Sequence, residues 1–204
     1  MNRQPHWETV YRTKEDADVS WTQQEPRLSL SLVREVCSPG GRVIDVGGGT
    51  SPLVDSLLDG GYRVTMLDIS SAALERSKAR LAERSSQVRW IVADVSDPAI
   101  DLGFHELWHD RAVFHFLTKA ADRSAYVSLL SRTLLVGGHA IIATFALDGP
   151  ERCSGLPVRR YDGPALAAEL GPAFTLVRSL PEAHVTPQGK TQSFQYSLFR
   201  RADG

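Results

Sequence analysis

A glycine-rich turn is the first feature of this sequence whose residue types could do chemistry. Gly47, Gly48 and Gly49 follow the apolar run 43–46 and directly precede Thr50-Ser51-Pro52. Glycines between a strand and a helix let the backbone turn sharply and let a ligand approach main-chain atoms. A tight turn without a ligand would use the same residues, so the glycines alone leave both interpretations open.

Two acidic residues further along favour a ligand. Asp68 follows Gly47 by roughly 20 residues, where a carboxylate at the end of the next strand accepts both hydroxyls of a ribose. Asp94 ends a third apolar run, and a carboxylate there accepts from an adenine amino group while the N–H of Val95 meets a ring nitrogen. We therefore predict a nucleoside site at three neighbouring strand ends, which Ile69 also lines.

The same residues favour S-adenosylmethionine (SAM) over NAD. The dinucleotide pattern G-x-G-x-x-G needs a third glycine at position 52, where this chain has Pro52. That glycine lets helix and strand pack closely around a pyrophosphate. Asp45, just before the turn, suits a cofactor that carries an ammonium group in place of phosphates. We expect SAM, with S-adenosylhomocysteine (SAH) as its product, and keep an NAD-linked oxidoreductase as the alternative.

Alternating strands and helices must position these residues. Apolar runs predict strands at 43–46, 63–67, 88–93, 107–112, 140–145, 174–180 and 193–199. Helical spacing and caps predict helices after Pro26, from Ser51 as N-cap with Pro52 first, after Ser70, at 124–135 (ended by Gly137-Gly138) and at 164–170. This alternation implies right-handed crossovers and a parallel sheet. We predict an α/β fold: a doubly wound, mostly parallel seven-stranded sheet that ends in an antiparallel hairpin, with helices on both faces.

Four stretches resemble the Rossmann-type (class I) SAM-dependent methyltransferases. VIDVGGGTSPL (43–53) resembles their first motif, VTMLDIS (64–70) their second and WIVADVSD (90–97) their adenine-contacting third. LLVGGHAIIATF (134–145) resembles the stretch around their fifth strand, with Val136 in place of the usual proline. The resemblance covers about residues 42–145. It implies a single domain over 1–204, with an N-terminal lid or helical segment at 1–40 and a Rossmann-like core at 41–204.

A shorter resemblance bears on the methyl acceptor. The stretch 109–113, His-Asp-Arg-Ala-Val, resembles the Trp-Asp-Arg-Gly stretch of thiopurine methyltransferases and related thiol and halide methyltransferases. It is also similar to the Asp-Lys-Gly stretch of some protein-lysine methyltransferases. The resemblance implies a small-molecule nucleophile, with a thiol or another soft acceptor favoured. Protein lysine and a non-catalytic SAM-binding subunit are the alternatives.

Three residues around the end of the fourth strand are candidates for the catalytic machinery. Methyl transfer from a sulfonium is an in-line displacement, so the enzyme mainly aligns the reacting atoms in a dry pocket. We expect Asp110 to contact the cofactor and to orient or deprotonate the nucleophile, Arg111 to hold an anionic one, and His115 to act as a base. The alternatives are that Asp110 and Arg111 pair or cap the next helix, and that His115 packs in the core.

Side chains from other segments are further pocket candidates. Trp21 and Tyr11 are expected to close over the pocket as a lid, with Trp21 stacking on the cofactor; packing against the sheet is the alternative. Cys153 lies in a Gly/Pro-rich loop after the fifth strand, on the side where the site must be. His184 lies in the turn region of the last hairpin, where an ordinary surface position is the alternative.

The composition excludes several other functions. The chain has 204 residues and a net charge of −1, which lacks the basic field that nucleic acid binding needs. Two cysteines are too few for a disulfide framework or a zinc site, so we expect a reducing compartment and no metal. No apolar run approaches the roughly 20 residues that span a bilayer, and the N-terminus does not resemble a signal peptide. A cytoplasmic protein with a small-molecule substrate and no membrane partner is therefore expected.

Overall fold

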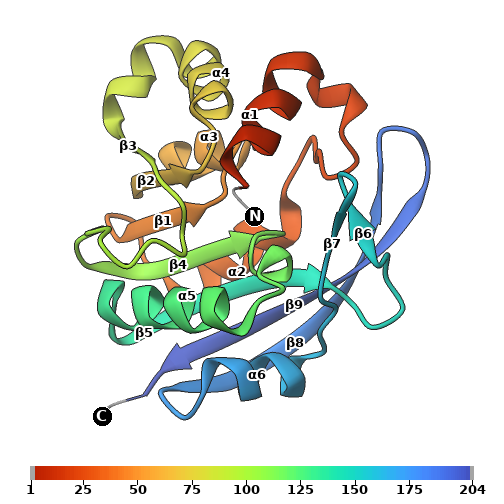
Figure 1. Ribbon diagram of the computed structural model, residues 1–204. Coiled ribbons are helices and arrows are strands. Elements are labelled where there is room, and N and C mark those ends of the chain that lie inside the picture. The colour runs from red at the N-terminus through yellow and green to blue at the C-terminus, as the bar shows by residue number, and fades with distance from the viewer. Residues whose placement is uncertain (1–2, 203–204) are drawn as a thin grey trace.

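One mostly parallel sheet runs through the molecule, as the computed structural model of residues 3–202 shows (Figure 1). Its seven strands are β1 (Arg42–Val46), β2 (Arg63–Asp68), β3 (Val88–Val92), β4 (His105–Arg111), β5 (Leu134–Phe145), β8 (Phe174–Val185) and β9 (Thr191–Arg201). Their order is β3-β2-β1-β4-β5-β9-β8, and only β9 and β8 run antiparallel to their neighbours. The predicted seven-stranded architecture with a terminal antiparallel hairpin is confirmed.

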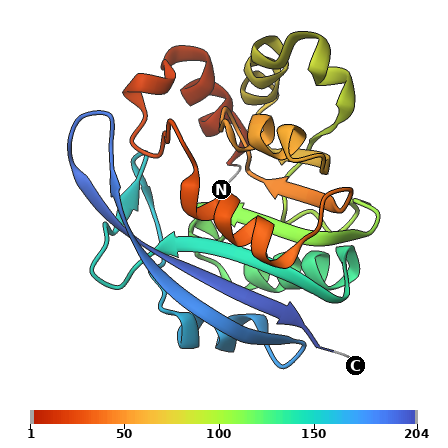
Figure 2. The same ribbon diagram turned by 180° about the vertical axis from the view of Figure 1, so that it is seen from behind.

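Helices cover both faces of the sheet and divide the core in two. The α-helices are α1 (Gln4–Thr13), α2 (Arg27–Val36), α3 (Leu53–Asp59), α4 (Ser71–Leu81), α5 (Ala120–Thr133) and α6 (Gly163–Leu170), and short 3₁₀ turns are η1 (Asp16–Asp18), η2 (Ala82–Gln87) and η3 (Phe114–Phe116). Apolar residues of α2, α3 and α4 pack on one face, and those of α5 and α6 on the other (Figures 1 and 2). Alternate residues of β1 serve the two cores, because Val43 faces the first and Ile44 the second.

The order of the strands fixes where a ligand site can form. The chain winds outward from β1 to β3, then returns to place β4 on the other side of β1. Connections on the two sides of β1 therefore leave in opposite directions, and a crevice opens at the carboxyl ends of β1 and β4. The glycine turn at 47–49 follows β1 directly at this point.

Some predicted boundaries were wrong. The helix α3 begins at Leu53, with Pro52 as its N-cap, one residue later than predicted; Ser51 Oγ still accepts from Leu53 N at 3.2 Å. The glycines 137 and 138 do not end a helix, since α5 stops at Thr133 and both lie inside β5. A Cβ on Gly138 would lie 2.8 Å from Glu106 O, where the register with β4 shifts. These glycines therefore mark a strand irregularity and a close backbone approach.

The two ends of the chain hold more regular structure than predicted. The strands β8 and β9 extend to a turn at residues 186–190, so His184 pairs with Gln192 inside the hairpin and is not in its turn. The loop after β5 contains a small hairpin, β6 (Arg152–Cys153) with β7 (Leu156–Pro157). The expected N-terminal lid contains the helix α1, which packs against α4. Among the described residues, no helix is long and apolar enough to cross a membrane.

Candidate cofactor and acceptor cleft

The turn after β1 has no room for side chains at its three glycines. Gly47 and Gly49 have φ of 65° and 51°, in the left-handed region that glycine tolerates. A Cβ on Gly47 would lie 2.0 Å from Val113 Cγ2, and one on Gly49 would lie 2.5 Å from Tyr11 Oη. The turn is therefore a main-chain surface, and Gly47 lines the cleft directly.

Asp68 ends β2 beside this turn and faces the cleft. Its Oδ2 accepts from Gly49 N at 3.0 Å and its Oδ1 accepts from Ser70 N at 2.8 Å. Burial raises the pKa of Asp68 to about 6, although these two hydrogen bonds oppose the rise. A carboxylate with spare lone pairs at this place fits the hydroxyls of a ribose.

Asp45 lies beneath the turn with one oxygen held and the other free of partners. Its Oδ1 lies 2.7 Å from His109 Nδ1, and the residue is 2% exposed. Its Oδ2 is buried and has no hydrogen-bond partner among the described residues. A Cβ on Gly48 would lie 2.8 Å from this oxygen, so Oδ2 faces the glycine turn. An unpaired buried carboxylate oxygen here fits the ammonium group of an amino acid.

Asp94 lies two residues beyond β3 at the far end of the cleft, with Val95 beside it. Its Oδ1 accepts from Ser96 N at 2.8 Å and from Ser96 Oγ at 2.7 Å. The guanidinium of Arg3 lies 3.3 Å from its two oxygens and 3.0 Å from Asp122. Burial alone would raise the pKa of Asp94, but the bonds from Ser96 and Arg3 lower it.

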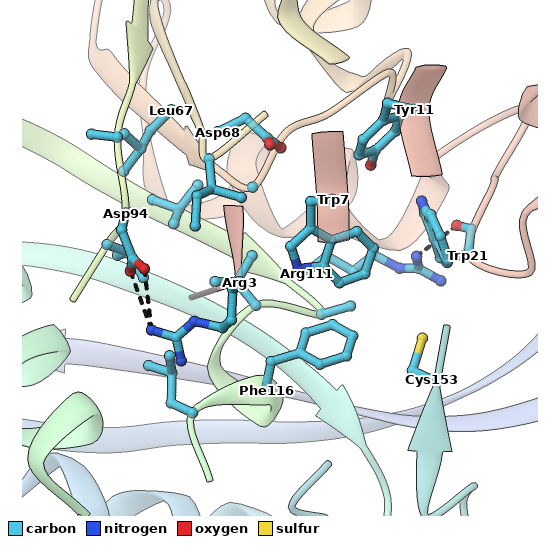
Figure 3. A pocket seen from close by; sticks show the side chains of 18 residues that line it. Arg3, Trp7, Tyr11, Trp21, Leu67, Asp68, Asp94, Arg111, Phe116 and Cys153 are labelled. Carbon is cyan, nitrogen blue, oxygen red and sulfur yellow. Dashed lines mark hydrogen bonds and ion pairs between the residues drawn. The ribbon is translucent and has the colours of Figure 1, made fainter. Parts of the chain in front are cut away.

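A single cleft joins Gly47, Asp68 and Asp94. It holds about 720 Å³ of empty volume, open solvent at its mouth included. Figure 3 shows Asp94 and Asp68 toward one end and Trp21 and Cys153 at the other. A smaller hollow with Asp45 and the glycine turn in its wall shares Trp21 and Gly47 with the cleft.

The expected lid residues do lie over the cleft, together with aromatic residues that the sequence did not single out. Trp7 packs edge-on against Phe116 at 5.0 Å and against Trp21 at 5.5 Å between ring centroids. Tyr11 lies 6.3 Å from Trp21 and lines the same cleft. The sequence feature that could have identified Trp7 is its spacing of four residues from Tyr11, because residues at this spacing in a helix lie on the same face.

Buried contacts hold this lid in place on both sides. On the α4 side, Glu8 accepts from Ser70 Oγ at 2.8 Å and from Ser71 Oγ at 3.1 Å. On the hairpin side, His184 Nε2 lies 2.7 Å from Ser20 O, and burial lowers the pKa of His184, so it donates as a neutral imidazole. His184 is thus a packed residue that fastens the lid, and it does not line the cleft.

Asp110 does not reach the cleft. It lies within β4, so its side chain points to the α5 face while its neighbours point to the opposite face. Its Oδ1 accepts from Val113 N at 2.9 Å, and its Oδ2 accepts from Phe114 N at 3.1 Å and Tyr126 Oη at 2.7 Å. The carboxylate caps η3 and is 0% exposed. The expected roles as cofactor contact and as base have no support in this placement.

His115 is also enclosed. Its Nδ1 accepts from Phe145 N at 3.3 Å, and its ring packs between Phe116 and Phe145. Burial lowers its pKa to about 3, with Arg111 adding to the effect. His115 is a packed core histidine, the alternative left open above, and is not among the residues that line the cleft.

Arg111 and Cys153 lie at the acceptor end of the cleft, which we define by Trp7, Trp21, Phe116 and these two. The Arg111 Nη1 donates to Trp21 O at 3.0 Å, and its guanidinium lies 4.3 Å from the centroid of the Phe194 ring. Burial raises the pKa of the Cys153 thiol to about 12, which keeps it neutral and unreactive.

Two sequence comparisons identify similar proteins. Residues 43–138 match a family model described as a methyltransferase domain. An eEF1A lysine and N-terminal methyltransferase from Danio rerio is 26% identical over 147 residues, which are 70% of this chain and 21% of that protein. The chain therefore spans about a fifth of the length of this relative.

Solved structures share the fold over nearly the whole chain. One, from work on the conversion of a disulfide bond into a thioacetal group during echinomycin biosynthesis, has a TM-score of 0.80 at 20% identity and covers 98% of this chain and 93% of its own. Another is the Burkholderia thailandensis 1,6-didemethyltoxoflavin-N1-methyltransferase with 1,6-didemethyltoxoflavin and SAH bound. Its TM-score is 0.73 at 22% identity, covering 98% of this chain and 84% of its own.

Proposed function

We propose that this chain, in which residues 43–138 match a methyltransferase-domain model, is a SAM-dependent methyltransferase that methylates a small-molecule nucleophile, with a thiol or another soft acceptor favoured. SAM supplies a methyl group that its sulfonium charge has already activated. The protein's part is to align the acceptor with that methyl group and to exclude water.

The residues at the acceptor end carry this proposal. Among the described residues, its lining contains no carboxylate and no histidine, because Asp110 and His115 are turned away from it. Asp68 and Asp94 lie at the opposite end of the cleft, which we call the nucleoside end. An amine with a pKa near 10 must lose a proton before it attacks, whereas a thiol with a pKa near 8.5 is partly ionised at neutral pH. A site without a base therefore favours a nucleophile that needs none.

Charge and ring contacts at the acceptor end support the same acceptor class. Arg111 is the cationic side chain there, and it favours an anionic nucleophile such as a thiolate. The rings of Trp7, Trp21 and Phe116 enclose the space and suit a polarisable acceptor and the sulfonium beside it. The enclosed cleft, roofed by α1, also favours a small acceptor over a side chain on another folded protein.

The test is transfer of label from methyl-labelled SAM. Purified protein is incubated with a panel of thiols, a panel of amines, and the low-molecular-weight and protein fractions of a cell extract. Label in thiols or in the low-molecular-weight fraction supports the proposal. Label confined to protein would refute it and favour the second candidate, a protein-lysine methyltransferase, which the similarity to the eEF1A lysine and N-terminal methyltransferase supports.

A further inference from the structure

Five polar side chains, four of them buried and Arg111 partly buried, form an unbroken chain of hydrogen bonds beside the cleft. Asp45 Oδ1 lies 2.7 Å from His109 Nδ1, and His109 Nε2 lies 2.9 Å from Ser29 Oγ. Ser29 Oγ lies 3.3 Å from Tyr196 Oη, which in turn lies 3.0 Å from Arg111 Nε. The chain links β1, β4, α2 and β9, and its two ends are a carboxylate and a guanidinium.

The chemistry of the two ends allows one continuous set of bond directions from Arg111 to Asp45. Arg111 can only donate, so Tyr196 Oη accepts from it and has its own proton free to donate to Ser29. Ser29 then donates to Nε2 of His109, and in this arrangement the Nδ1 of His109 carries a proton. That proton points at Asp45, which can only accept when ionised. The Asp45–His109–Ser29 arrangement therefore holds His109 in one tautomer and one orientation.

The position of Asp45 gives this arrangement a use. Its Oδ1 is occupied by His109, while Oδ2 is buried, unpartnered and next to the glycine turn. Asp45, His109 and Ser29 all line the smaller hollow that adjoins the cleft. The free Oδ2 of Asp45 is therefore the acceptor through which His109 and Ser29 can act on a ligand's ammonium group.

We propose that His109, held by Ser29, is a positioning residue for the cofactor's amino-acid end. By donating to Oδ1, His109 holds the Asp45 carboxylate turned so that Oδ2 receives the ammonium group of SAM. This inference rests on SAM binding in the cleft. It assigns His109 to the cofactor, although its place beside Asp110 and Arg111 in the sequence associated it with the acceptor.

Two ligands that differ only at the amino-acid end separate this role from a general structural one. SAH carries the ammonium and carboxylate groups, whereas 5′-methylthioadenosine has the same nucleoside and sulfur without them. Isothermal titration calorimetry should show that His109→Leu weakens SAH binding by about 10- to 100-fold, as loss of a bond to a charged group implies. Its affinity for 5′-methylthioadenosine should stay within about twofold of wild type, a difference of only about 0.4 kcal/mol.

A conservative variant and a matched control complete the test. His109→Asn keeps an N–H near the position of Nδ1 and should restore most of the SAH affinity. His105→Leu is the control, because His105 is on the same strand, is 3% exposed like His109 and also pairs with a buried side chain, Thr65 Oγ1, at 2.9 Å. It lies at the far end of β4 from the cleft, so it should leave both affinities unchanged.

Each result decides the question. Unchanged SAH affinity in His109→Leu, or equal losses for both ligands, would overturn the role of His109. Wild-type protein that binds neither ligand would overturn the proposed function together with it. If His109→Leu does not fold, Ser29→Ala provides the same comparison: a selective loss of SAH affinity supports the relay, and no selective loss refutes it.

Discussion

At the scale of single residues, the nucleoside end of the cleft keeps an ionisable group in an unfavourable setting. Asp68 is buried, and its pKa rises to about 6. Because the folded-state pKa exceeds the unfolded value, the stability that Asp68 contributes is fully present below pH 4 or so and is lost as the pH rises through about 6. The empty protein therefore carries a buried charge at neutral pH that a ribose would solvate.

Ligand binding should report this pKa directly. We expect the affinity for 5′-methylthioadenosine to fall as the pH is lowered through about 6, because the protonated Asp68 carboxyl is a weaker acceptor for ribose hydroxyls. Asp68→Asn should weaken binding at pH 7.5 by about 1–3 kcal/mol and remove the dependence on pH. Calorimetric titrations of both proteins between pH 5 and 8 check this; a pH dependence that survives in the variant would show that another group is responsible.

At the scale of secondary-structure elements, one carboxylate fastens α1 to the start of α4. Glu8 accepts from the hydroxyls of Ser70 and Ser71 and from Ala72 N at 3.3 Å. Burial alone would raise its pKa, but these bonds and Arg12 lower it to about 2. An anion at the first turn of α4 also interacts favourably with that end of the helix.

Loss of this contact should release α1. Glu8→Gln is expected to speed amide hydrogen exchange over residues 4–13 and to leave exchange in β1 and β4 unchanged, since local opening need not disturb the core. Because the pKa of Glu8 is lowered, its contribution is present above pH 4.5 and lost as the pH falls toward 2. Glu75→Gln is the control, since Glu75 pairs with Lys78 on the exposed surface of α4, away from α1. Equal exchange in both variants would show that Glu8 does not hold the lid.

At the scale of the whole molecule, ligand binding and folding are coupled through the cleft. Because the site is assembled from strand ends, α1 and the loop before α2, a bound cofactor should stabilise the folded state as one unit. At a SAH concentration 100 times its Kd, the expected gain is about 2.7 kcal/mol, or roughly 5–10 °C in Tm for a domain of this size. Thermal scans with SAH and NADH check this, and NADH should give no shift.

Local pattern sufficed to predict the strands and to place the glycine turn, Asp68 and Asp94 at one edge of the sheet. Each of these groups directly follows an apolar run in the sequence: the glycine turn follows 43–46, Asp68 follows 63–67 and Asp94 follows 88–93. Their positions at strand ends therefore follow from the periodicity of the runs. The directions of side chains at the end of β4 did not, because successive side chains alternate between the two faces and a one-residue error in register reverses all of them. That is why Asp110 became a cap and His109 a partner of Asp45.

The packed position of α1 could not be predicted from the sequence either, because it depends on contacts with residues far away in the chain. Only Val10 and Tyr11 of this helix are buried, so its sequence lacks a continuous apolar stripe. The helix is held by the hydrogen bond that Glu8 accepts from Ser70 at the start of α4 and by the packing of Trp7 against Phe116. Both partners lie more than 60 residues away in the sequence.

The clasp between Arg3 and the two carboxylates at the nucleoside end has a consequence for turnover. Arg3 bridges Asp94 and Asp122, whose side chains are about one-third exposed, so dissolved ions screen these pairs. Raising the ionic strength should therefore accelerate the release of SAH, because we expect the product to leave past this clasp. Stopped-flow displacement at 50 and 500 mM NaCl measures this, and in Arg3→Ala release should be fast at both concentrations. A salt-independent wild-type rate would place the exit elsewhere. If product release limits the catalytic cycle, the turnover rate will rise with salt concentration. Enzymes that rely on electrostatic attraction to capture their substrates show the opposite dependence.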